Sequence, residues 1–275
     1  MNSRLVKSSD MTDEETLQVH QERVVAAVGV LTGLNNVSPA NSTSAAFLAL
    51  QFVGKQKAHT DSLLALGDSM DCHLVLRTMI EGWSQICWVF EGLVDGVNQS
   101  QIEAIMLRAQ TRADLWRNSW GVSAFREMRH LKRSELPREV WGKWGDWFDE
   151  HGATYLNKPA KKRKPDRDTI WEIAKPFVLE WNDMSIRATL PSFCRDGMYD
   201  WVYSPMSQWA HWDARTIAQA SQRSLLEGGR MYRLTTKELI KIWRMAANLL
   251  CDTGKLTGYV CGLPEVNQRL VELDP

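Results

Sequence analysis

The sequence predicts an all-α protein, an irregular multi-helix bundle with a buried central helix. Long segments repeat apolar residues at helical spacing, whereas alternating strand patterns and Asn-Gly hairpins are almost absent. No repeat of fixed period is visible, so a solenoid is not indicated. The balance of 44% hydrophobic and 24% charged residues is typical of a globular chain.

In the first half of the chain, helix boundaries follow from acidic and turn-forming residues. Asp13 begins a helix, since Glu14 and Glu15 place negative charge in its first turn. Asn, Ser and Pro are concentrated over residues 35–44, which predicts a loop. The helices expected here are residues 13–30, residues 45–92 (continuous or interrupted near Gly67) and residues 98–120.

In the second half, Pro, Ser and Thr mark the starts of helices. Ser204 and Pro205 suit the N-cap and the first helical position, and Thr236 is the expected cap of the last long helix. Gly254 is expected to close that helix, which leaves residues 260–275 as a loose tail with one turn of helix at most. The helices expected here are those opened by Pro137 and Asp168, residues 204–227 and residues 236–252.

The expected organisation is one helical domain over residues 14–260, between a flexible tail at 1–13 and a C-terminal tail at 261–275. Apolar stretches such as residues 86–90 are far too short to cross a bilayer, and the polar N-terminus does not resemble a signal peptide. Five cysteines without a C-x-x-C pair predict reduced thiols. A cytoplasmic protein without membrane contact is therefore expected.

The net charge is zero, but the basic residues are concentrated in the middle of the chain. Residues 108–167 carry 15 basic and 8 acidic side chains, and they include a basic loop at 158–167. The candidates for contact with nucleic-acid phosphates are Lys161, Lys162, Arg163 and Lys164. Such runs are more often solvated loops. Nearby tryptophans suit base stacking, a homodimer interface or the core: Trp116, Trp120, Trp141, Trp144 and Trp147.

Residues 74–90 are apolar on nearly every face of a helix, which predicts that they form the buried central helix. Arg77 and Glu81 interrupt this segment one turn apart. Buried charge is costly unless it is paired, and Arg before Glu is the weaker order for a pair within one helix. The partners of both residues are therefore expected to come from another helix.

A second polar motif recurs at intervals of four residues in Tyr203, Ser207 and His211. Ser207 and His211 would lie one turn apart on a helix. The residues around them include Trp201, Met206, Trp209 and Trp212, which are apolar, so His211 must find a partner or stay neutral. We expect this helix to contact the one that carries Arg77 and Glu81, with either charge near His211.

The two motifs, Arg-x3-Glu and Tyr-x3-Ser-x3-His, resemble those of an uncharacterised bacterial helical family, catalogued as domain of unknown function 5677. The matching residues are Arg77, Glu81, Tyr203, Ser207 and His211, which span almost half of the chain. Trp212 follows the histidine, where the family has a small residue. The resemblance implies an all-helical fold in which these polar residues meet in the bundle core, and it implies no established activity.

Two classes of function are consistent with these patterns. The first is an intracellular accessory or defence-type protein that binds nucleic acid or a protein partner. The second is a small hydrolytic enzyme in which His211 is the base, Glu81 the orienting carboxylate and Arg77 the anion binder. A buried polar network that fixes helix register is the structural alternative for the same residues.

Several other chemistries lack their sequence motifs. The chain has no P-loop, no G-x-G-x-x-G after a strand, no H-E-x-x-H and no G-x-S-x-G. A metal site would have to draw on scattered residues, namely His59, His73, Glu81 and His211. The chain has a single E-x-x-H, Glu127 with His130, whereas a di-iron site needs two, so neither a metal nor another cofactor is expected.

Overall fold

The computed structural model describes residues 11–36, 43–93, 101–128, 198–199, 203, 206 and 233–273. These residues form six α-helices and one short 3-10 helix, and no named strand occurs among them. The prediction of an all-α, multi-helix bundle is therefore confirmed for the part of the chain that is described.

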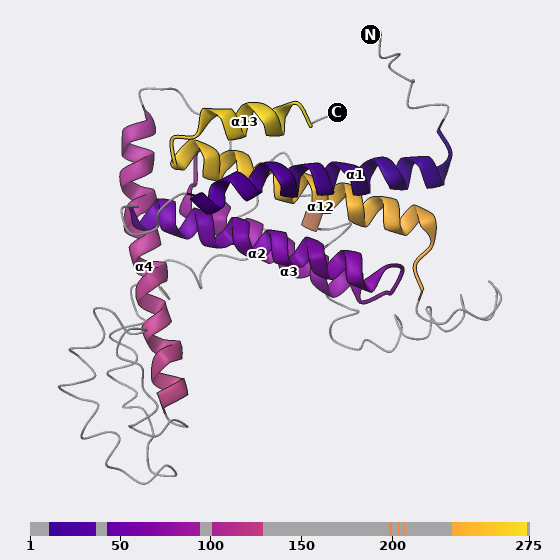
Figure 1. Cartoon of the computed structure of the whole chain (residues 1–275). Helices are drawn as coiled ribbons and strands as arrows, with labels where there is room; N and C mark the ends of the chain where they lie inside the picture. The colour runs from indigo at the N-terminus through magenta and orange to yellow at the C-terminus, as the bar shows by residue number, and fades with distance from the viewer. Residues whose placement is uncertain are drawn as a thin grey trace. The chain divides into compact units, whose positions relative to one another are not determined.

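Contacts divide the chain into two compact units, Met1–Met106 with Ile186–Pro275, and Leu107–Ser185. The described helices of the first unit are α1 (Asp13–Thr32), η2 (Gly33–Asn36), α2 (Ser44–Leu66), α3 (Cys72–Val89), α12 (Thr236–Val260) and α13 (Pro264–Val271) (Figure 1). Helix α4 (Ile102–Met128) begins in the first unit and continues into the second. The predicted boundaries of a single domain at 14–260 stay a prediction.

Two of the helices begin with the same capping box. Thr12 accepts a hydrogen bond from the backbone of Glu15, whose side chain accepts one from the backbone of Thr12 in return. Thr235 and Glu238 repeat this arrangement at the start of α12. The cap of α12 is thus Thr235 and not Thr236 as predicted. Each box satisfies two backbone donors that a helix start leaves unpaired.

Helix α12 is the central element of the first unit, because it contacts α1, α2, α3 and α13. The predicted central helix was residues 74–90, which corresponds to α3. Helix α3 is buried mainly in its second half, whereas Leu74 in its first half is 38% exposed. Helix α3 is therefore amphipathic in its first half and buried in its second half.

The turn between α2 and α3 is hydrogen-bonded and ion-paired to the residues just before α12. Gly67 ends α2 with a φ of 60°, a backbone conformation that favours glycine. Beyond it, the backbone of Leu234 donates a hydrogen bond of 2.7 Å to the carbonyl of Asp68, and the side chains of Asp68 and Arg233 form an ion pair. The predicted interruption near Gly67 is confirmed.

The end of α12 differs from the prediction. Gly254 does not close the helix, which continues to Val260. A β-carbon on Gly254 would lie 2.6 Å from Leu31 Cδ2 and 2.8 Å from Leu270 Cδ1, so this glycine lets α1 and α13 approach α12 closely. Gly254 is therefore a packing position within α12 and not its end.

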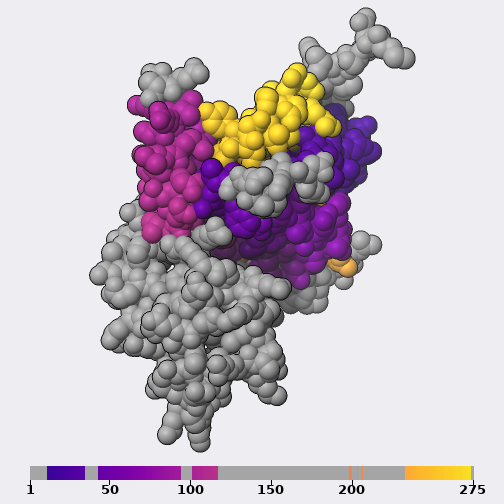
Figure 2. All heavy atoms as spheres, turned by 60° about the vertical axis from the view of Figure 1, so that its left-hand side comes forward, coloured from indigo at the N-terminus to yellow at the C-terminus, as the bar shows by residue number. Residues whose placement is uncertain are grey.

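The expected loose tail after residue 260 is also corrected. Residues Pro264–Val271 form α13, which packs on α12 and α1 and buries Val266 and Leu270. Figure 2 shows the surface of α13 in yellow against that of α1 in indigo. Val266 and Leu270 lie four residues apart, and Pro264 begins the helix, so a helical pattern was present in the sequence.

Several predicted elements lie outside the described residues. These are residues 1–10 of the tail predicted at 1–13, the helices opened by Pro137 and Asp168, the basic loop at 158–167 and most of the helix at 204–227. Helix α4 is described to Met128, eight residues beyond its predicted end. None of the described helices combines the length and the apolar character that a membrane-spanning segment needs.

Candidate functional site

Arg77 and Glu81 lie one turn apart on α3 and pair with each other. Arg77 Nε donates a hydrogen bond of 3.0 Å to Glu81 Oε1. The two side chains are 22% and 33% exposed. The two charges thus pair with each other at partly exposed positions, and the expectation that they are buried was wrong. The expected partner from elsewhere in the chain is present for Glu81 as well. The first half of α3 is amphipathic, so both side chains stay at its half-exposed border.

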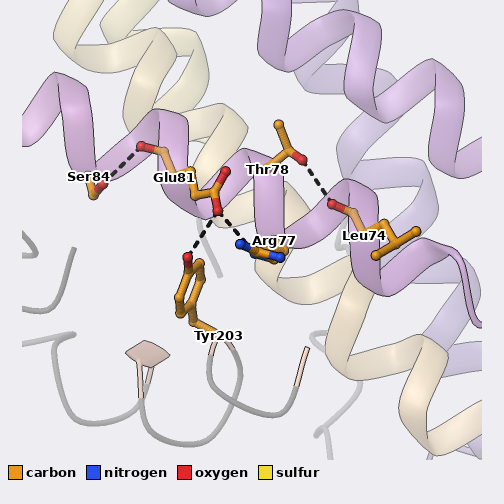
Figure 3. Close-up of polar contacts among 6 residues, drawn as sticks. All are labelled: Leu74, Arg77, Thr78, Glu81, Ser84 and Tyr203. Carbon is orange, nitrogen blue, oxygen red and sulfur yellow. Dashed lines mark hydrogen bonds and ion pairs between the residues drawn. The ribbon is translucent and has the colours of Figure 1, made fainter. Parts of the chain in front are cut away.

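Tyr203 joins this pair from a distant part of the chain. Its hydroxyl donates a hydrogen bond of 2.9 Å to Glu81 Oε1, the oxygen that Arg77 also binds (Figure 3). The ring of Tyr203 lies 5.5 Å from Arg77 Cζ, which is a cation–π distance. One carboxylate oxygen thus accepts from two donors, and one aromatic ring lies against the guanidinium.

Tyr199 stacks against the ring of Tyr203. The two rings stack with centroids 5.4 Å apart and planes at 22°. Tyr203 is only 8% exposed, so its orientation is fixed by packing as well as by its hydrogen bond. Tyr199 was not among the predicted site residues. The two tyrosines are four residues apart, a spacing that places side chains next to each other on a helix, and this spacing could have indicated Tyr199 from the sequence.

The surroundings keep Tyr203 protonated and Arg77 charged. Burial raises the pKa of Tyr203, and the Glu81 carboxylate adds to this effect, while Arg77 opposes it. Burial alone would lower the pKa of Arg77, but the neighbouring Tyr203 and Glu81 outweigh it and raise that pKa. At neutral pH, Tyr203 is therefore a neutral donor next to a charged pair.

Ser84 lies on the same side of α3, one turn after Glu81. Its hydroxyl donates a hydrogen bond of 2.9 Å to the backbone carbonyl of Glu81, and the residue is fully buried (Figure 3). This bond satisfies the serine within its own helix. Ser84 therefore supports α3 and does not extend the polar cluster.

The structure brings together three of the five predicted site residues: Arg77, Glu81 and Tyr203. Ser207 and His211 lie outside the described residues, as do the candidate phosphate-binding residues Lys161, Lys162, Arg163 and Lys164. Trp120, Trp141, Trp144 and Trp147 of the tryptophan-rich segment are likewise outside the described side chains. The expected contact with His211 stays a prediction.

Among the histidines of the first unit, His20 on α1 and His59 on α2 have shifted pKa values. Burial, together with Arg244 and Arg23, lowers the pKa of His20. Burial and the nearby Lys55 lower the pKa of His59. Within the described ranges, no three His, Cys, Asp or Glu side chains are grouped as a metal site requires.

Comparison with known proteins gives no relative for this chain. No family model, no curated protein and no solved structure matches it. The resemblance to domain of unknown function 5677 therefore stays a prediction that rests on the residues of the two motifs.

Proposed function

We propose that this chain is a small enzyme of hydrolytic type whose site is built on Arg77, Glu81 and Tyr203. The hydrogen bond between Tyr203 and Glu81 carries the proposal, because it joins two motifs that lie 122 residues apart in sequence. The side chains of Arg77 and Glu81, which Tyr203 contacts, are 22% and 33% exposed, so solvent has access to the pair. A network that only fixed helix register would need no such access.

Ser207 and His211 complete the proposed site. They follow Tyr203 by four and eight residues, so even a fully extended chain keeps them within roughly 14 and 29 Å of it. In the proposed reaction, His211 takes a proton from water, whose oxygen attacks the ester carbon or phosphorus. The ester bond breaks, and His211 returns the proton to the leaving alcohol. Glu81 orients the groups around it, and Arg77 binds the negative charge.

Turnover of simple chromogenic esters tests the proposal. Suitable probes are p-nitrophenyl acetate, p-nitrophenyl phosphate and bis(p-nitrophenyl) phosphate, whose hydrolysis releases coloured p-nitrophenolate. We expect the full chain to hydrolyse at least one of them. His211→Ala and Glu81→Gln should lower kcat/KM by about 100-fold or more, since general acid–base groups contribute that much. His20→Ala, on α1, is the matched control and should keep full activity.

The outcome that contradicts the proposal is equally direct. If none of the three probes is turned over, or if His211→Ala is as active as the unmodified chain, the site is not hydrolytic. Circular dichroism of each variant separates lost chemistry from lost folding, because a folded all-α chain gives a strong helical spectrum.

Nucleic-acid binding through the basic loop stays a separate prediction. Its candidate residues, Lys161, Lys162, Arg163 and Lys164, are outside the described part of the chain. If they contact phosphates, affinity for RNA or DNA should fall steeply with salt, and neutralising all four should flatten that dependence. Absence of binding at low salt would end this hypothesis.

A further inference from the structure

We infer that Arg77 holds an oxyanion of the substrate, a carboxylate or a phosphate, through its two terminal nitrogens. This inference rests on the proposed function and names the substrate class of that site. Three features of the guanidinium group support it: the contacts that orient the group, the N–H donors that these contacts do not use, and the charges nearby.

The edge of the Arg77 guanidinium is only partly used within the protein. Its Nε donates to Glu81 Oε1 at 3.0 Å, and a side-chain hydrogen bond with Tyr203 helps to raise the pKa of Arg77. A guanidinium carries five N–H donors, so these two partners use only some of them. The side chain is also 22% exposed. Two parallel N–H donors at the edge of a planar guanidinium match the two oxygens of a carboxylate or phosphate.

Tyr203 and Glu81 hold this edge in one orientation. Glu81 fixes Nε, and the ring of Tyr203 lies 5.5 Å from Arg77 Cζ. Tyr203 is itself held by its bond to Glu81 and by the stack with Tyr199. A guanidinium that is already oriented loses less side-chain freedom on binding, which favours affinity.

The local charge decides which variant should strengthen binding. Arg77 and Glu81 together carry no net charge. A bound oxyanion is therefore attracted by the hydrogen-bond donors of Arg77 and repelled by the negative charge of the Glu81 carboxylate. Glu81→Gln keeps an oxygen that accepts from Arg77 Nε and removes the opposing charge. It should therefore bind the oxyanion as tightly as the unmodified chain, or more tightly.

Ligand-observed NMR on the full chain at low ionic strength is the experiment. The probes are inorganic phosphate, followed by its ³¹P line width, and acetate, followed by saturation transfer. We expect at least one anion to bind, and Arg77→Lys to weaken it by about tenfold, because lysine keeps the charge but loses the paired donors. Arg269→Lys, on the exposed surface of α13, is the matched control and should bind normally.

Each result has a defined meaning. The preferred anion identifies the source of the oxyanion, phosphate or carboxylate. The inference is overturned if neither anion binds, if Arg77→Lys binds normally, or if Arg269→Lys weakens binding equally. Oxyanion binding without ester turnover would reject the hydrolytic function alone. Turnover with an unchanged KM in Arg77→Lys would reject the role of Arg77 alone.

Discussion

The hydroxyl of Tyr203 and the side chain of Glu81 are joined by a hydrogen bond of 2.9 Å across 122 residues of sequence. The same oxygen of Glu81 also accepts from Arg77, so this contact ties a distant segment to an ion pair within α3. It is the contact on which both the structural and the catalytic interpretations of the cluster depend.

Tyr203→Phe removes this hydrogen bond but keeps the ring against Arg77. We expect the free energy of unfolding to fall by about 1 kcal/mol, because the bond reaches a charged acceptor that is partly exposed to water. Urea denaturation measures the change. Tyr259→Phe, at a 44% exposed tyrosine on α12, is the control and should change stability by less than about 0.5 kcal/mol. Equal losses in both variants would contradict the predicted role of the hydroxyl.

Gly254→Ala should destabilise the protein by about 1–3 kcal/mol. The added β-carbon would meet Leu31 and Leu270, which are both fully buried and have little room to move. Gly54→Ala, in an exposed position of α2 with open space around it, should instead stabilise by about 0.5–1 kcal/mol, because alanine favours helix. Thermal unfolding of the two variants should move in opposite directions. A stable Gly254→Ala variant would show that α1 and α13 are not held this closely.

Stability should rise with pH through the range in which His20 and His59 titrate. Both have folded-state pKa values below the ordinary 6.5, so just below that pH the unfolded chain binds more protons than the folded one. The contribution of these two histidines to the free energy of unfolding is therefore fully present above about pH 6.5, and it is lost as the pH falls from there toward their folded-state pKa values. Urea midpoints between about pH 5 and pH 7.5 should show this slope, and His20→Gln and His59→Gln should each reduce it. A slope unchanged in the double variant would assign it to other groups.

Cys72 should resist alkylation in the native protein. Burial, with Asp71 and Asp68 nearby, raises the pKa of its thiol to about 11, so only about one molecule in a thousand carries the reactive thiolate at pH 8. Iodoacetamide at that pH, with peptide mass spectrometry, should find Cys72 unmodified until urea is added. Cys261, which is less buried, should react sooner. Rapid native labelling of Cys72 would mean that the start of α3 opens often.

The helices were predictable because their signals are local. Asp13, Glu14 and Glu15 begin α1, and the interruption at Gly67 follows from a residue that adopts a positive φ. The prediction that Gly254 ends α12 is wrong because, in sequence alone, a glycine that ends a helix cannot be told from one that lets a neighbouring helix approach. The identity of that neighbour, Leu31 of α1, is a property of the tertiary structure.

The sequence predicted which residues form the candidate site better than it predicted how they contact one another. The spacing of Arg77 and Glu81 indicated a polar feature on an apolar helix, and Tyr203 belonged to the second motif. Sequence could not decide whether the charges would bond to each other, since that depends on how far α3 is covered. Partial exposure keeps the internal ion pair in contact with water, which lowers the cost that had argued against it.

The central place of α12 has a consequence for the order in which this protein folds. Helix α1 packs on α12, and Arg23 Nη1 bonds to Asn248 Oδ1 across 225 residues. During synthesis, α1, α2 and α3 emerge from the ribosome long before α12 can cover their apolar sides. Joining segments so distant costs loop-closure entropy and is typical of slow folding. We therefore expect this unit to acquire its stable structure only after translation has passed α12, with its first helices exposed to chaperones until then.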